Sequence, residues 1–289
     1  MIKTILVAAT GNEGDAASFA AALALARPCA AHLDVLHVRL DAVSVAVAMS
    51  TDAGSGALTA GIIEQFEKDA RDREAKARDN FTRFCAAAGL AETAAPASAA
   101  GAGGPSAEWH AEIGEESRWM AIYGVAADLI VAPRATGEDA VAGSILETVL
   151  LETGRPVVIP AVSAMPANFE RVAIAWKPTA QAARAVAAAM PLLTRAKEIV
   201  VLTVEEPEAG HHDADRLVRN LAWHGIAATT ASLKPEHAGT GATLLAGARD
   251  RADLLVMGGY GHSRLREWVF GGVTQLVLAD APLPVLIAH

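Results

Sequence analysis

ADLLVMGGYGHSRLREWVFGGVTQLVLADAPLPVLIAH, residues 252–289, is the stretch of sequence that decides the fold. It begins with Ala252–Met257, a short apolar run that is typical of a buried strand. A glycine-rich loop follows, and glycine lets the chain turn tightly because it has no Cβ. Val273–Leu278 then favours a helix, which two prolines end before a last apolar run, Val285–Ala288. The stretch therefore predicts a strand, a glycine loop, a helix and a second strand.

The glycines of this loop have a defined spacing, Gly258-x2-Gly261-x9-Gly271-Gly272. A helix that starts just after glycines leaves several backbone N–H groups unpaired and pointing one way. Together with the helix dipole, these groups favour a phosphate or another anion. The spacing differs from the P-loop, which needs Gly-Lys-Ser/Thr, and from G-x-G-x-x-G. Two interpretations stay open, an anion-binding loop and a purely structural turn.

The chain repeats its pattern of apolar segments once. A repeat of this length indicates two copies of a whole domain rather than a solenoid. The boundary falls in a short Ala/Ser/Pro segment, Pro160–Asn168, so we predict one domain over residues 1–162 and a second over residues 168–289. The matching segments are 127–131 with 252–256, 155–159 with 283–287, 5–9 with 172–176, and 33–38 with 199–204.

Strand-like and helix-like segments alternate along both copies. The strand-like segments are apolar throughout, which is typical of parallel strands that helices cover on both faces. Ligands of such sheets bind beyond the carboxyl ends of the strands, where the strand order reverses. In the first copy, Asp15 follows the turn after the first strand, and we expect its side chain to cap the following helix.

Composition excludes several classes of function. The 289 residues are 52% hydrophobic, and the net charge of −9 argues against a nucleic-acid partner, which needs a basic face. Apolar runs stay shorter than the ~20 residues of a membrane span, and the N-terminus lacks the layout of a signal peptide. The cysteines are Cys29 and Cys85, so the sequence predicts neither a disulfide framework nor a metal cluster. This low cysteine content predicts a cytoplasmic protein.

The glycine spacing resembles that of the universal stress protein family, G-x2-G-x9-G followed by Ser or Thr. The flanking words VMGGYGHSR and APLPVLI are similar to that family as well. The resemblance implies two tandem Rossmann-like domains of the adenine nucleotide alpha hydrolase-like kind, each a five-stranded parallel sheet flanked by helices. It also implies a stress-response regulatory protein that binds ATP or a related nucleotide in its second copy, with Mg²⁺ accompanying the ATP.

The resemblance places nucleotide contacts at the strand ends and around the glycine loop. Two positions depart from the family pattern. Lys177 stands where ATP-binding members have an Asp, and it can meet a phosphate but cannot accept a hydrogen bond. Gly272 stands at the Ser/Thr position, with Thr274 two residues on. The implied contact residues are Ala175, Trp176, Lys177, Thr203, Val204, Met257, Gly258, Gly261, His262, Ser263, Arg264, Gly271, Gly272, Val273 and Thr274.

The first copy departs further from the motif. From Asp128 to Gly143 there are 15 residues, against 18 from Asp253 to Gly271, so the loop is three residues shorter. Pro133 takes the place of the first loop glycine and has no N–H to offer a phosphate. We therefore expect the first copy to bind no nucleotide and to pack against the second.

Two classes of function remain open, a nucleotide-binding regulator and a stress scaffold that acts through protein contacts without nucleotide. The sequence offers neither a general base nor a Walker-type metal ligand, so it predicts no catalytic residue and at most slow ATP hydrolysis. His211-His212-Asp213 is more typical of a solvated turn than of a metal site. The sequence therefore predicts no metal ligand set.

The family pairs its domains through their last strands. The resemblance therefore implies that Val157–Pro160 and Val285–His289 lie together in an intramolecular pseudo-dimer. It leaves room for a homodimer and for an unknown protein partner.

Overall fold

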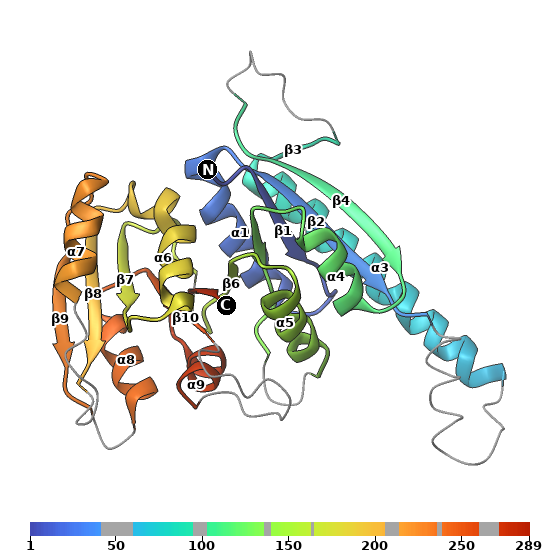
Figure 1. Ribbon diagram of the computed structural model, residues 1–289. Coiled ribbons are helices and arrows are strands. Elements are labelled where there is room, and N and C mark those ends of the chain that lie inside the picture. Colours follow the sequence, from blue (N-terminus) through green and yellow to red (C-terminus); the bar gives the residue numbers. More distant parts are fainter. Residues whose placement is uncertain are drawn as a thin grey trace.

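The protein is described by a computed structural model that covers most of the chain (Figure 1). The two sequence copies lie side by side, and the C-terminus lies in the middle of the molecule beside the last strand of the first copy. Among the described helices, none is both long and apolar enough to span a membrane. The structure describes residues 1–41, 60–94, 103–135, 140–162, 165–205, 214–235, 239–259 and 272–289.

The strands of the described residues form one sheet of 11 strands, in the order β3-β4-β2-β1-β5-β6-β11-β10-β7-β8-β9. Every neighbouring pair is parallel except β6 with β11. The strands are β1 Thr4–Ala8, β2 His32–Arg39, β3 Ala91–Glu92, β4 Ser106–Ile113, β5 Leu129–Val131, β6 Val157–Ile159, β7 Arg171–Ala175, β8 Glu198–Val204, β9 Thr229–Leu233, β10 Leu254–Gly258 and β11 Val285–Ala288.

The strand order reverses once in each half, between β1 and β5 in the first and between β7 and β10 in the second. This is the doubly wound arrangement of a Rossmann-like fold. The predicted fold class, α/β with mostly parallel strands, is therefore confirmed. The first half adds the two-residue edge strand β3 to its five main strands. The division into domains 1–162 and 168–289 stays a prediction.

Helices cover both faces of the sheet (Figure 1). One core cluster lies under α1, α3, α6 and α7, and the other lies under α4, α5, α8 and α9. The described helices are α1 Asp15–Cys29, α3 Ala60–Ala88, α4 Glu116–Gly124, α5 Ala140–Glu152, α6 Ala180–Leu193, α7 Ala214–Trp223, α8 Thr240–Arg249 and α9 Gly272–Asp280.

This double cover explains why the strand segments are apolar throughout. Along β1, Ile5 and Val7 belong to the first core cluster, whereas Leu6 and Ala8 belong to the second. All four side chains are at most 1% exposed. Successive strand residues point to opposite faces, so a strand that is covered twice needs an apolar residue at every position.

The two halves join through the antiparallel pair β6 and β11. Val158 lies opposite Leu286 in the first core cluster, while Ile159 lies opposite Val285 in the second. The expected pairing of the last strands is therefore present within one chain. Each core cluster runs through both halves without a break at the joint.

Arg134, just after β5, adds a polar link between the halves. Its guanidinium donates hydrogen bonds to the carbonyl oxygens of Pro160, at 2.9 Å from Nε, and of Ala281, at 3.3 Å from Nη2. It also donates to the carbonyl of Leu278, in the last turn of α9. Burial lowers the pKa of Arg134 to about 10, with Asp280 opposing, so the group is a cation at neutral pH. A cation of the first half thus caps the C-terminus of a helix in the second.

The expected role of Asp15 as a helix cap is wrong. Gly14 holds the N-cap position and makes no side-chain cap bond. The Asp15 carboxylate is 1% exposed and accepts hydrogen bonds from the backbone N–H groups of Thr10, at 2.8 Å, and Gly11, at 2.9 Å. The N–H groups of the turn after β1 therefore occupy the Asp15 carboxylate, in place of the N–H groups of the helix.

Replacing Arg134 by Met tests the link between the halves. Arg134→Met keeps the apolar stem but leaves carbonyl groups of both halves without their donor, so we expect the free energy of unfolding to fall by about 2–3 kcal/mol. Urea unfolding followed by circular dichroism measures the change. Arg195→Met is the control, because Arg195 is exposed, follows α6 and bonds to the carbonyl of Pro191 in the last turn of that helix. Equal effects of both changes would contradict the role of Arg134.

Candidate functional site

The second half has its strand reversal between β7 and β10, which is where ligands of this fold bind. Ala175 ends β7 and pairs with Met257 of β10. Gly258 ends β10 one residue later. The structure therefore brings these three predicted contact residues together at the carboxyl edge of the sheet.

The turn from β7 into α6 carries the charged residue of the site. Trp176 donates its backbone N–H to the carbonyl of Leu202, at 2.9 Å, so the chain stays tied to β8. Lys177 follows and is exposed. Thr179 then caps α6 by accepting a hydrogen bond from the N–H of Ala182, at 3.2 Å. A lysine thus stands at the sheet edge beside the N-terminus of a helix.

Trp176 contributes mainly to packing. Its ring packs against the core cluster that α6 and α7 share. The indole Nε1 is buried and has no hydrogen-bond partner among the described residues. Buried donors normally have a partner. The Trp176 side chain therefore serves as packing of the second half, and its indole donor has no partner among the described residues.

The end of β8 lies beside the end of β7. Ala175 pairs with Leu202, so Thr203 and Val204 extend past the last residue of β7. Thr203 is half-buried and Val204 is 8% exposed. The two residues therefore border the same edge as Lys177, and their predicted backbone contact with a base stays a prediction.

Packing explains Gly258 of the motif and its neighbour Gly259. A Cβ on Gly258 would lie 2.6 Å from the carbonyl carbon of Gln181 and 2.8 Å from the Cα of Ala182, both backbone atoms of α6. A Cβ on Gly259 would lie 2.8 Å from Cγ1 of Ile287 in β11. These distances are too short for non-bonded carbon atoms. The helix α6 can approach β10 this closely only because Gly258 lacks a side chain, and a Cβ on Gly259 would require the Ile287 side chain to move.

The start of α9 is open at Gly272 and packed at Thr274. Gly272 is exposed, and a Cβ there would have no neighbour within 4 Å among the described residues. Val273 is half-buried, while Thr274 is 7% exposed. Gly272 therefore leaves room for a ligand or a hydroxyl at the helix N-terminus, where backbone N–H groups favour an anion.

The centre of the predicted glycine loop lies outside the described residues. Its contacts with the strand ends stay a prediction, and so does the solvated turn predicted for His211-His212-Asp213, which lies outside them as well. The predicted site residues in this position are Gly261, His262, Ser263, Arg264 and Gly271.

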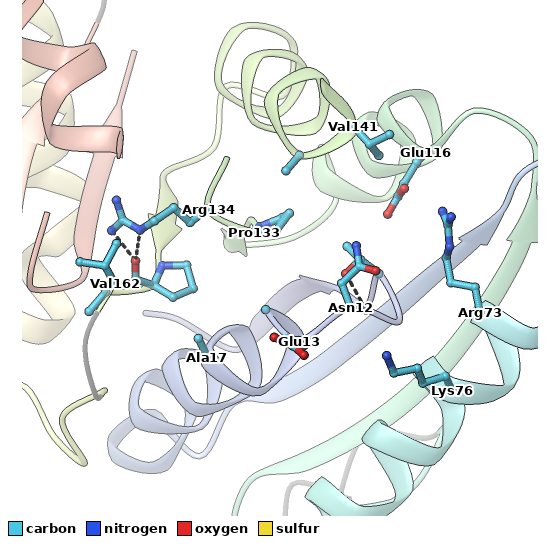
Figure 2. A pocket seen from close by; sticks show the side chains of 15 residues that line it. Asn12, Glu13, Ala17, Arg73, Lys76, Glu116, Pro133, Arg134, Val141 and Val162 are labelled. Carbon is cyan, nitrogen blue, oxygen red and sulfur yellow. Dashed lines mark hydrogen bonds between the residues drawn. The ribbon is translucent and has the colours of Figure 1, made fainter. Parts of the chain in front are cut away.

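The first half has a cleft of about 700 Å³ at its own strand reversal, between the ends of β1 and β5 (Figure 2). The volume lies in the range of small-molecule pockets. Its charges are mixed, because Arg73 and Lys76 of α3 share the lining with Glu13 and Glu116. Arg134, on the opposite side from α3 in Figure 2, is already bonded to backbone carbonyls. The absence of nucleotide from this half stays a prediction.

Comparison with known proteins bears on the second half by sequence and on the whole chain by fold. Residues 227–289 match the model of the universal stress protein family. This match confirms the resemblance seen in the glycine motif. A search of curated proteins found no match.

Solved structures share the fold. A universal stress protein from Archaeoglobus fulgidus is 16% identical, with a TM-score of 0.68 over 99% of this chain and 98% of its own. A putative universal stress protein from Pseudomonas aeruginosa is 14% identical, with a TM-score of 0.54 over 99% of this chain and 93% of its own. A universal stress protein in complex with cAMP is 17% identical over 55% of this chain and 99% of its own, with a TM-score of 0.37. The first two likenesses support a tandem arrangement of this fold along the chain.

The glycines at the two ends of the loop should respond differently to substitution. Gly258→Ala forces a Cβ against the backbone of α6, so we expect the free energy of unfolding to fall by about 1–3 kcal/mol. Gly272→Ala meets no described atom within 4 Å and should leave stability unchanged or slightly raised. Urea unfolding of both variants checks this. A Gly258→Ala protein as stable as the parent would show that the close approach of α6 is not required.

Proposed function

We propose that this chain, whose residues 227–289 match the universal stress protein family, binds ATP or a related nucleotide at the strand reversal of its second half. The observation that carries the proposal is that β7 and β10 end side by side at the strand reversal, with exposed Lys177 following β7 and exposed Gly272 starting α9, the helix that comes after β10. The function is regulatory, and ATP steadies a conformation or a partner surface.

The phosphates account for most of the affinity in this proposal. Lys177 donates hydrogen bonds and carries a positive charge, so it suits a phosphate oxygen. The first N–H groups of α9 have no carbonyl partner within their own helix, and the dipole favours negative charge there. Mg²⁺ would accompany the nucleotide through its phosphate oxygens. We therefore expect ATP to bind more tightly than adenosine.

The nucleoside would be held mainly by the backbone. With Lys177 in place of an acidic residue, the edge of β7 offers no side-chain carboxylate to a ribose hydroxyl or an adenine amine. Thr203 and Val204 border the edge and can present backbone groups to a base. This favours a site that discriminates by the number of phosphates more than by the base.

The rest of the chain fits a supporting role. We propose two domains, residues 1–162 and 168–289, of which the first serves as the structural partner of the second. In the first half, Asp15 closes the turn after β1 and Arg134 binds carbonyl groups, so both polar groups are engaged within the protein. We propose a cytoplasmic protein with surface left for self-association or another protein.

A stress scaffold without nucleotide is the second candidate. Packing alone explains Gly258 and Gly259, and Gly272 lacks the family hydroxyl. On this reading, the glycine loop is architecture and the chain acts through protein contacts.

Titration of the full chain with ATP and Mg²⁺ by calorimetry separates the two candidates. We expect one site per chain, and Lys177→Ala should weaken ATP about tenfold, or by about 1.4 kcal/mol, because a phosphate loses a charged donor. Adenosine binding should change little. Lys197→Ala is the matched control, because exposed Lys197 pairs with Glu170 at the opposite, amino-terminal edge of the sheet.

A third variant sharpens the titration. Gly272→Ser restores the family hydroxyl where no described atom lies within 4 Å of a Cβ, so it should tighten ATP binding without loss of stability. If the parent chain and Gly272→Ser both give no heat with ATP, the nucleotide proposal fails and the scaffold stands.

A further inference from the structure

Two strands of the first half bring together two histidines and two carboxylates. His32 and Asp34 lie on β2, and Glu108 and His110 lie on β4. The strands are parallel, and their register places Asp34 directly opposite Glu108. Residues two apart on a strand share a face, so all four side chains lie on one face of the sheet. This is the face that α4 covers further along β2 (Figure 1).

The polar atoms of these residues lie close together. His32 Nε2 is 3.5 Å from Oδ1 of Asp34 and 4.0 Å from Oε2 of Glu108. His110 Nε2 is 3.2 Å and 3.7 Å from the same two oxygens. The ligand atoms of His32, Asp34 and Glu108 all lie within 4.8 Å of one another. We call these four residues the β2–β4 cluster.

We propose that the β2–β4 cluster binds a divalent transition-metal cation of the Zn²⁺ type, with His32 Nε2, Asp34 and Glu108 as ligands. Zinc bonds of about 2.0–2.2 Å place tetrahedral ligand atoms about 3.3 Å apart. The distances of 3.5 Å and 4.0 Å from His32 to the two carboxylates are near this value. Small side-chain rotations therefore complete the site, and a fourth position stays open to water.

The surroundings orient the ligands. His32 Nδ1 lies 2.8 Å from Oγ of Ser106, a contact that turns Nε2 toward the carboxylates. A hydrogen bond of this kind fixes the ring of metal-binding histidines. His110 lies beside both carboxylates, and its ring centroid is 5.3 Å from that of Tyr123 on α4. His110 is therefore a positioning residue that holds Asp34 in place.

Burial and charge also favour a cation here. The cluster side chains are 22–28% exposed, so two carboxylates face each other in a partly dry environment. An imidazole nitrogen among the ligands favours Zn²⁺, Cu²⁺ or Ni²⁺ over Mg²⁺ and Ca²⁺.

The cluster is separate from the proposed nucleotide site. His32 begins β2, so the cluster lies toward the amino-terminal ends of its strands. The strand reversals that form the clefts open at the carboxyl ends. Metal binding by the cluster and nucleotide binding in the second half can therefore succeed or fail independently.

Equilibrium dialysis of the tag-free full chain against Zn²⁺, with calorimetry, tests the proposal. We expect one Zn²⁺ per chain, an affinity loss of at least about 100-fold in Asp34→Asn, and a rise of the melting temperature with Zn²⁺ that this variant lacks. Glu112→Gln is the matched control. It removes one carboxylate from the same face of β4, where Glu112 accepts from Tyr123 at 2.7 Å, and should leave Zn²⁺ binding intact.

Further variants keep the test decisive if Asp34→Asn does not fold. Ser106→Ala removes only the group that orients His32, so it should weaken Zn²⁺ about tenfold. His110→Asn should weaken Zn²⁺ binding while keeping one site and the visible absorption of bound Co²⁺, as expected of a positioning residue.

A His211→Asn/His212→Asn double variant should bind Zn²⁺ as the parent does. The proposal is overturned by a chain that takes up no Zn²⁺, by an unchanged affinity in both Asp34→Asn and Ser106→Ala, or by loss of binding in the double variant.

Discussion

Three residue pairs, Val157–Ile159 of β6 against Val285–Ile287 of β11, join two parallel sheets into one. Without this antiparallel pairing, each half would end in a fully apolar edge strand, which is a template for aggregation. With it, both core clusters continue across the joint, and Arg134 of the first half caps α9 of the second. The helix that closes the proposed nucleotide site is thus held at its far end by the other half.

The fold could be predicted from the sequence because it depends on local patterns. Apolar runs such as Ala252–Met257 predict doubly covered strands, and the match between the copies predicts the tandem arrangement. Side-chain roles depend on register and close approach, which patterns do not contain. Asp15 binds the turn behind it instead of the helix ahead, and Gly258 is required by the backbone of α6. The β2–β4 cluster joins residues 74 or more positions apart through strand register alone, so no spacing in the sequence predicts it.

The halves share a topology but differ in chemistry at the strand reversal. In the first, the Asp15 carboxylate binds backbone N–H groups that a ligand could otherwise meet, and the lining charges are mixed. In the second, Lys177 is exposed at the edge, and no described atom lies within 4 Å of a Cβ built on Gly272 at the start of α9. The halves therefore share a fold, and we propose nucleotide binding for the second alone. The proposed metal site belongs to the first half. The second half has no matching pair of residues, because Glu198 and Val200 at the start of β8 stand where β2 has His32 and Asp34.

The most direct measurement of the central claim is to denature freshly purified protein and to separate the released small molecules by anion-exchange chromatography. The account predicts an adenine nucleotide, at up to one per chain, that refolded protein takes up again from solution. A preparation that releases no nucleotide and takes up none would contradict it, and the glycine loop would then be a structural turn.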